Sequence, residues 1–236
     1  MEHMKRRYTD QGYAEELQEI RERLLLMASR VENIIENALA ALVERDADRA
    51  RNTILADRAI NQDEIDLDAL CLQLLACRQP MASDLRFITT TLKMVTDLER
   101  IADLAVNVCE RACDLALKPQ LAPYIDIPSM GRIVRGMIHD AIDGFVEGDV
   151  EKAREVLERD DEVDELYHKV FRHLLELMNE QPDNIHAGIH VQSVAKYIER
   201  MGDHSMNIAE QVVFMLEGLD IRHEGKLVKP ERGHHG

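Results

Sequence analysis

The chain has 236 residues, 45% of them hydrophobic, which is enough for one large domain or two small ones with buried cores. Its formal net charge of −16 argues against binding to nucleic acid or to anionic lipid, because both attract basic surfaces. Aromatic residues make up only 4%, while Ala, Leu, Glu and Arg are abundant, so the composition favours helices over strands.

No part of the chain reads as a membrane span or a signal peptide. The most apolar stretch, residues 69–77, is far too short to cross a bilayer, and the basic start has no apolar segment behind it. The four cysteines form no C-x-x-C pair, which favours free thiols in a reducing compartment. We therefore expect a cytoplasmic protein without membrane insertion.

Prolines mark the ends of the expected helices. Pro80 and Pro182 interrupt otherwise helical text in the two halves, and Pro119, Pro123 and Pro128 cluster in a segment typical of a linker. Between these breaks, apolar residues recur at helical spacing. The pattern predicts six long helices at roughly residues 13–45, 47–78, 83–117, 129–147, 150–179 and 184–217.

The two halves of the chain repeat one another. The segment "VERDADRA" at 43–50 resembles "VEGDVEKA" at 146–153, with Asp46 and Asp149 each placed as a helix N-cap. In the same way, "LERIADLAVNVCE" at 98–110 matches "IERMGDHSMNIAE" at 198–210. The predicted fold class is therefore all-α, with two tandem three-helix bundles at residues 1–118 and 129–222, a linker at 119–128 and a polar tail at 223–236.

The repeated acidic phrase supplies one wall of a candidate site in each bundle. Residues four apart project from one helix face, and helices joined by short connections run antiparallel. Counting outward from each turn places Asp57 opposite Asp103, and Asp160 opposite Asp203. Each half is expected to gather four oxygen-bearing side chains at one level: Asp57, Asn61, Glu99 and Asp103 in the first, and Asp160, Asp164, Glu199 and Asp203 in the second.

Gathered carboxylates repel one another unless a cation neutralises them, and oxygen-rich clusters suit Mg²⁺, Mn²⁺ or iron. The opposing interpretation is an ordinary solvated helix motif, in which Arg100 or Arg200 pairs with a carboxylate. Two copies in register leave both interpretations open. Because Asn61 stands where the second half has Asp164, the first site is expected to bind a cation more weakly.

Two other pairs have the spacing of metal ligands. Glu165 and His168 match half of a di-iron motif, but the first half has no equivalent pair, so His168 is expected to be solvated. His186 and His190 lie four residues apart near a helix start and are expected to be surface residues.

The stretch "RQPMASDLR" at 78–86, with "LERIADLAVNVC" and "YIERMGDHSMNIAE", resembles the PhoU family of bacterial phosphate-uptake regulators. The same stretch predicts a helix that begins after Pro80 with its N-cap near Ser83. The resemblance covers residues 12–222 and implies two three-helix bundles, a homodimer and a cytosolic, non-enzymatic role.

Further properties follow from the resemblance alone. Family members repress the phosphate-starvation response by linking the Pst phosphate transporter, through its ATPase, to a phosphate-sensing histidine kinase. Some bind metal through Glu/Asp-x-x-x-Asp motifs, and these match the eight residues named above. The resemblance therefore implies divalent or iron-type metal ions, namely Mg, Mn, Fe or Zn, as cofactors.

Two other functions stay open. A helical metalloenzyme with a carboxylate-bridged centre would need an enclosed pocket and a catalytic base, and a metal-buffering protein would bind metal without a partner protein. The sequence contains no phosphate-binding glycine loop and no recognisable nucleophile–base arrangement. A regulator and adaptor is therefore the leading interpretation.

Overall fold

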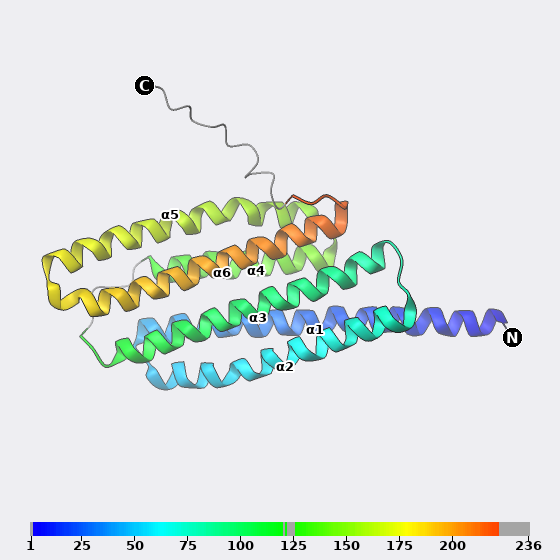
Figure 1. Cartoon of the computed structure of the whole chain (residues 1–236), viewed down its shortest axis with the longest axis horizontal. Helices are drawn as coiled ribbons and strands as arrows, with labels where there is room; N and C mark the ends of the chain where they lie inside the picture. Colours follow the sequence, from blue (N-terminus) through cyan, green and yellow to red (C-terminus); the bar gives the residue numbers. More distant parts are fainter. Residues whose placement is uncertain (1, 120, 122–125, 222–236) are drawn as a thin grey trace, which may run out of the picture.

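The computed structural model describes residues 2–119, 121 and 126–221, with side chains described from residue 12 onward. This part of the chain is helical and contains no strand (Figure 1). Its elements are α1 (Glu2–Glu44), α2 (Ala47–Arg78), α3 (Ser83–Ala116), α4 (Ile127–Glu147), α5 (Val150–Glu180), a short 3₁₀ turn (Pro182–Asn184) and α6 (Ile185–Glu217). The all-α prediction is confirmed, and five of the six helices lie within two residues of their expected bounds.

The helix boundaries follow from local chemistry. Asp46 accepts hydrogen bonds from the backbone of Asp48 and Arg49 at the start of α2, and Asp149 caps α5 in the same way. Both predicted N-caps are confirmed. The N-cap of α3 is Ala82, with φ of 48° and no side-chain hydrogen bond, so the prediction for Ser83 was wrong by one residue.

Helix α1 begins earlier than expected, at Glu2 rather than near residue 13. Gly12 lies just before the expected start. A single glycine costs only about 1 kcal/mol in a helix, and the preceding segment contains no proline that would stop it. The predicted polar tail at 223–236 lies outside the described residues.

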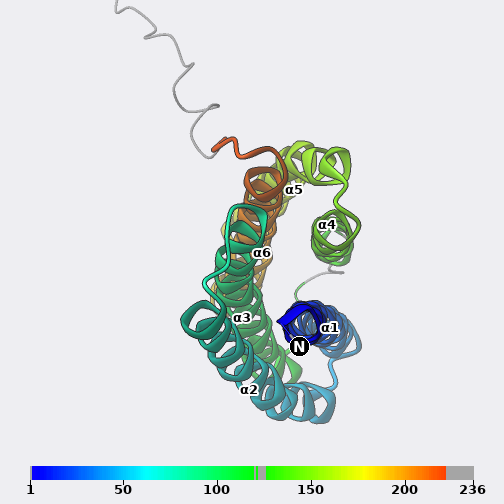
Figure 2. The same ribbon diagram turned by 90° about the vertical axis from the view of Figure 1, so that its right-hand side faces the viewer.

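The six helices form two layers. Viewed along the helices, α2, α3, α6 and α5 follow one another in an outer arc, and α1 and α4 lie on its inner side (Figure 2). Each half supplies two outer helices and one inner helix, so the duplication seen in the sequence is also present in the fold. The layers enclose one continuous core with buried aliphatic residues from all six helices.

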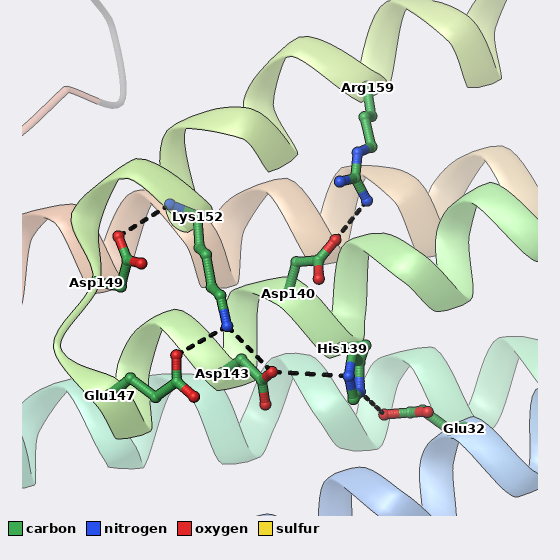
Figure 3. Close-up of polar contacts among 8 residues, drawn as sticks. All are labelled: Glu32, His139, Asp140, Asp143, Glu147, Asp149, Lys152 and Arg159. Carbon is green, nitrogen blue, oxygen red and sulfur yellow. Dashed lines mark hydrogen bonds and ion pairs between the residues drawn. The ribbon is translucent and has the colours of Figure 1, made fainter.

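The inner helices are tied across the two halves and to the outer layer. His139 on α4 lies 3.4 Å from Glu32 on α1 and 3.7 Å from Asp143, and Lys152 on α5 reaches Asp143 at 3.3 Å (Figure 3). Arg159 on α5 pairs with Asp140 of α4, and Arg135 of α4 pairs with Glu36 of α1. These contacts hold the inner layer against the arc.

Candidate metal-binding sites

The first candidate site lies between α2 and α3. Asn61 on α2 donates a hydrogen bond to Asp57 Oδ2 at 2.9 Å. Burial raises the pKa of Asp57, and the Asp103 carboxylate across the helix pair raises it further. Burial also raises the pKa of Glu99, with added repulsion from Asp103 and Asp57. The four predicted side chains of the first half therefore interact through one hydrogen bond and through their charges.

The structure adds a carboxylate that the sequence analysis missed. Glu64 on α2 has its pKa raised by burial and by the charges of Asp68 and Asp103, and it also repels Glu99. It lies seven residues after Asp57, so two helical turns bring both to one face. The repeated motif has a spacing of four residues, so it does not include Glu64. Glu64 is thus a fourth carboxylate within electrostatic range of the first site, as Asp161 is a fifth in the second.

The second candidate site lies between α5 and α6. Asp160 on α5 has its pKa raised from 3.8 to about 6, first by burial and then by the charges of Asp203, Asp164, Asp161 and Glu199. Asp160 is therefore within electrostatic range of the other three predicted side chains. Asp160 packs on the α6 backbone, since a Cβ added to Gly202 would stand 3.5 Å from its Oδ1.

Each site also holds a cationic side chain. Arg100 lies 3.5 Å from both Glu99 and Asp103 in the first site, as the solvated-motif interpretation expected. In the second site the cation is Lys196, whose Nζ lies 2.6 Å from Glu199, and not Arg200. Asp203 is exposed, yet partial desolvation and the Glu199 carboxylate raise its pKa. Lys196 therefore neutralises the negative charge of the second site only in part.

Several oxygen atoms in these sites lack hydrogen bonds. Oδ1 of Asp57, Oδ1 of Asn61 and Oε2 of both Glu99 and Glu199 are shielded from solvent and accept no hydrogen bond. The two glutamate oxygens have ion-pair neighbours, Arg100 and Lys196, whereas those of Asp57 and Asn61 have none. Buried oxygens of this kind suit a hard cation. Within the described ranges, however, no three His, Cys, Asp or Glu side chains converge closely enough to hold a metal ion.

The remaining candidates have structural explanations. His168 is exposed beside Tyr167, as expected. The His186 and His190 rings stack 4.8 Å apart, and His190 is largely buried against Asp114, contrary to a simple surface position. The four cysteines are free, and two of them, Cys71 and Cys109, are buried.

The fold and the two acidic sites define a class: an internally duplicated helical protein with one oxygen-rich site between the outer helices of each half. None of the helices in the described residues is long and apolar enough to cross a membrane. The PhoU domain model matches residues 24–112 and 127–212, one match in each half. The chain belongs to the PhoU family.

Individual relatives agree along nearly the whole chain. The "Phosphate-specific transport system accessory protein PhoU homolog" of Aquifex aeolicus is 39% identical over 89% of this chain and 95% of its own length. The PhoU protein of Escherichia coli is 33% identical over 89% of this chain and 87% of its own length. The crystal structure of PhoU from Pseudomonas aeruginosa matches with a TM-score of 0.85 at 36% identity, over 88% of this chain and all of the other. PhoU from Streptococcus pneumoniae matches with a TM-score of 0.81 at 28% identity, over 89% and 99% of the two chains.

Proposed function

We propose that this chain is a cytoplasmic, non-enzymatic regulator of phosphate uptake. In phosphate-replete cells it would repress the phosphate-starvation response as an adaptor between the ATPase of the Pst phosphate transporter and a phosphate-sensing histidine kinase. The observation that carries the proposal is the full-length match to relatives named as accessory proteins of phosphate-specific transport. Dimerisation is part of the same proposal.

The outer arc supports an adaptor role because both acidic sites lie in it. Each site lies between an end helix of the arc and one of its two central helices (Figure 2). With a net charge of −16, the chain is suited to a partner that offers a basic surface. An adaptor needs only accessible surface of this kind, and no substrate pocket.

The proposal includes metal binding at both sites. In the first half the ligands would be Asp57, Asn61, Glu99 and Asp103, with Glu64 as an added carboxylate. In the second they would be Asp160, Asp164, Glu199 and Asp203. The unsatisfied oxygens and the raised pKa values support a hard or borderline cation, namely Mg, Mn, Fe or Zn. The bound ion would neutralise the gathered carboxylates.

The enzyme alternative finds less support in the described residues. A groove of about 670 Å³ runs between α1 and α2 and is lined by residues such as Arg30, Asn37 and Arg49. None of the eight predicted site residues lines this groove. A metalloenzyme would be expected to place its carboxylates at such a cavity.

The test is deletion of the gene in its own host. The deletion strain should express phosphate-starvation genes in phosphate-replete medium, and a plasmid copy of the wild-type gene should restore repression. Complementation with a variant carrying Asp103→Asn and Asp203→Asn then asks whether the acidic sites contribute. Normal repression in the deletion strain, in a host with no second copy of the gene, would contradict the regulator proposal.

A further inference from the structure

Lys196 on α6 places its ammonium group on the Glu199 carboxylate of the second candidate site. Its Nζ lies 2.6 Å from both Oε1 and Oε2, so the ammonium group contacts both oxygens. The Glu199 side chain is only 14% exposed, whereas that of Lys196 is 47% exposed. The charge of Lys196 also interacts with the Asp203 carboxylate. A cation of this chain therefore already contacts both oxygens through which Glu199 would bind a metal ion.

Helix α5 holds the lysine from the other side. The Lys196 Nζ lies 5.4 Å from the centre of the Tyr167 ring, a distance at which an ammonium group is attracted to an aromatic face. The Tyr167 hydroxyl accepts a hydrogen bond from Gln192 Nε2 at 2.9 Å, which fixes the position of the ring. Tyr167 lies seven residues after Asp160, so both project from one face of α5. The ammonium group is thus held between a carboxylate and an aromatic ring.

The internal duplication provides a site without this lysine. A displacement of 100 residues aligns the two acidic phrases and gives Lys196 the counterpart Thr96. Thr96 is exposed, and its hydroxyl donates to the Leu92 carbonyl of its own helix at 3.2 Å. The displacement of 103 residues that aligns α2 with α5 gives Tyr167 the counterpart Glu64. The first site therefore has a hydroxyl and a carboxylate where the second has an ammonium group and an aromatic ring.

The arginine of the repeated phrase does not make an equivalent contact in either half. Arg100 lies 3.5 Å from Glu99, and its side chain is 58% exposed, so the contact is long and solvated. Its counterpart Arg200 is exposed and makes no hydrogen bond or ion pair within the described part of the chain. Exposed charges of this kind contribute little. Of these three cations, Lys196 is the one in close contact with a site carboxylate.

We propose that Lys196 is a tethered competitor of the metal ion at the second site. The ammonium group and a metal ion carry like charges, so the ion can bind both Glu199 oxygens only after the ammonium group has left them. Because the lysine side chain is half-exposed, it can rotate away without movement of the helices. The second site consequently binds metal less tightly than its carboxylates alone would. This inference rests on the metal binding included in the proposed function.

Calorimetric titration of the full, chelator-treated chain with Mn²⁺ tests the proposal. Lys196→Gln removes the charge at similar side-chain length and should lower the dissociation constant of the second site about tenfold. The matched control is Arg200→Gln, which removes the same charge next to Glu199 and should change that constant by less than about twofold. Adding Asp203→Asn to Lys196→Gln should abolish the gain, which assigns it to the second site. Circular dichroism checks that helix content is retained.

The reverse exchange transfers the lysine to the first half. Thr96→Lys should raise the Mn²⁺ dissociation constant of the first site about tenfold, since it places an ammonium group beside Glu99. Thr96→Gln, which is uncharged, is its control and should leave the constant within about twofold. An effect of equal size in the two variants would assign the change to side-chain bulk and overturn the competition by charge.

The outcomes separate this inference from the proposed function. Unchanged Mn²⁺ affinity in Lys196→Gln, with binding intact in the wild type, would overturn the role of Lys196 and leave the metal sites standing. Binding at the second site in Lys196→Gln but not in the wild type would support competition and contradict metal binding by the native chain there. Absence of Mn²⁺ binding in every variant would overturn both. Repression of phosphate-starvation genes is measured independently, so the regulator role can hold in each case.

Discussion

Asp97 on α3 accepts a hydrogen bond from Nδ1 of His204 on α6 at 2.8 Å, across the boundary between the two halves. Gln211, two turns further along α6, donates to the other oxygen of the same carboxylate at 2.9 Å. The Asp97 side chain is only 14% exposed, so these contacts are largely shielded from water. One aspartate therefore holds the centre of the seam that joins the two repeats.

We expect Asp97→Asn to lower the free energy of unfolding by about 2 kcal/mol. The asparagine has an NH₂ group in place of one carboxylate oxygen, and this group would face the donor of either His204 or Gln211. Urea denaturation followed by circular dichroism measures the change. The control is Asp114→Asn on the same helix pair, where the nearest histidine nitrogen is 3.6 Å away and the carboxylate is 47% exposed. This control should change stability by less than about 0.5 kcal/mol. Equal effects at the two positions would contradict a special role for Asp97.

Asp160 should make the metal-free protein less stable as pH rises. Its native pKa of about 6 lies above its ordinary value of 3.8, so the folded state keeps a proton that the unfolded chain has lost. Stability should fall between these two values by on the order of 1 to 3 kcal/mol and then level off. Denaturation in the presence of a chelator, repeated along this pH range, measures the slope.

Asp160→Asn should remove much of that slope, and Glu158→Gln, at an exposed position on the same helix, should not. An unchanged slope in Asp160→Asn would mean that other carboxylates carry the pH dependence.

Much of this architecture could be predicted from the sequence because the determining signals are local. Pro80 and Pro182 mark the breaks, Asp46 and Asp149 cap helices, and short turns fix the register that brings Asp57 to Asp103. The meeting of α3 and α6 could not be predicted. No motif in the sequence singles out Asp97 or His204, and only the packing of one half on the other reveals that they pair.

The candidate sites show a similar division. The repeated phrase identified the paired carboxylates, since residues four apart share a helix face. Glu64 was missed because it lies two turns from Asp57 and has no acidic counterpart in the second half. Lys196 was missed because it precedes the repeated phrase. Glu64 adds a carboxylate to the first site, and Lys196 adds a cation to the second.

Binding to the transporter ATPase or to the kinase should weaken as ionic strength rises. A chain of net charge −16 attracts a basic partner surface, and salt screens that attraction. Binding of the purified proteins in increasing sodium chloride, with an uncharged solute at matched osmolality as the control, measures the effect. Affinity that is indifferent to salt would indicate a mainly apolar interface.

The affinity of each proposed metal site should change when its carboxylates are substituted. With Mn²⁺ as the probe, calorimetric titration should detect both sites, with the second the tighter because more carboxylates act there. Glu64→Gln should weaken the first site further, and Asn61→Asp should strengthen it.

The substitution Asp203→Asn at the second site gives the clearest test, because its expected effects on stability with and without metal differ in sign. Metal at about a hundred times its dissociation constant adds roughly 2.7 kcal/mol of stability to a protein that binds it only when folded. The substitution should remove much of this gain. Without metal it should leave the protein equally or slightly more stable, because it relieves repulsion by Glu199 and Asp164. Thermal unfolding with Mn²⁺ and with a chelator separates the two effects. If Asp203→Asn instead destabilises the metal-free protein and leaves the Mn²⁺ response intact, Asp203 acts as an ion-pair residue and does not bind metal.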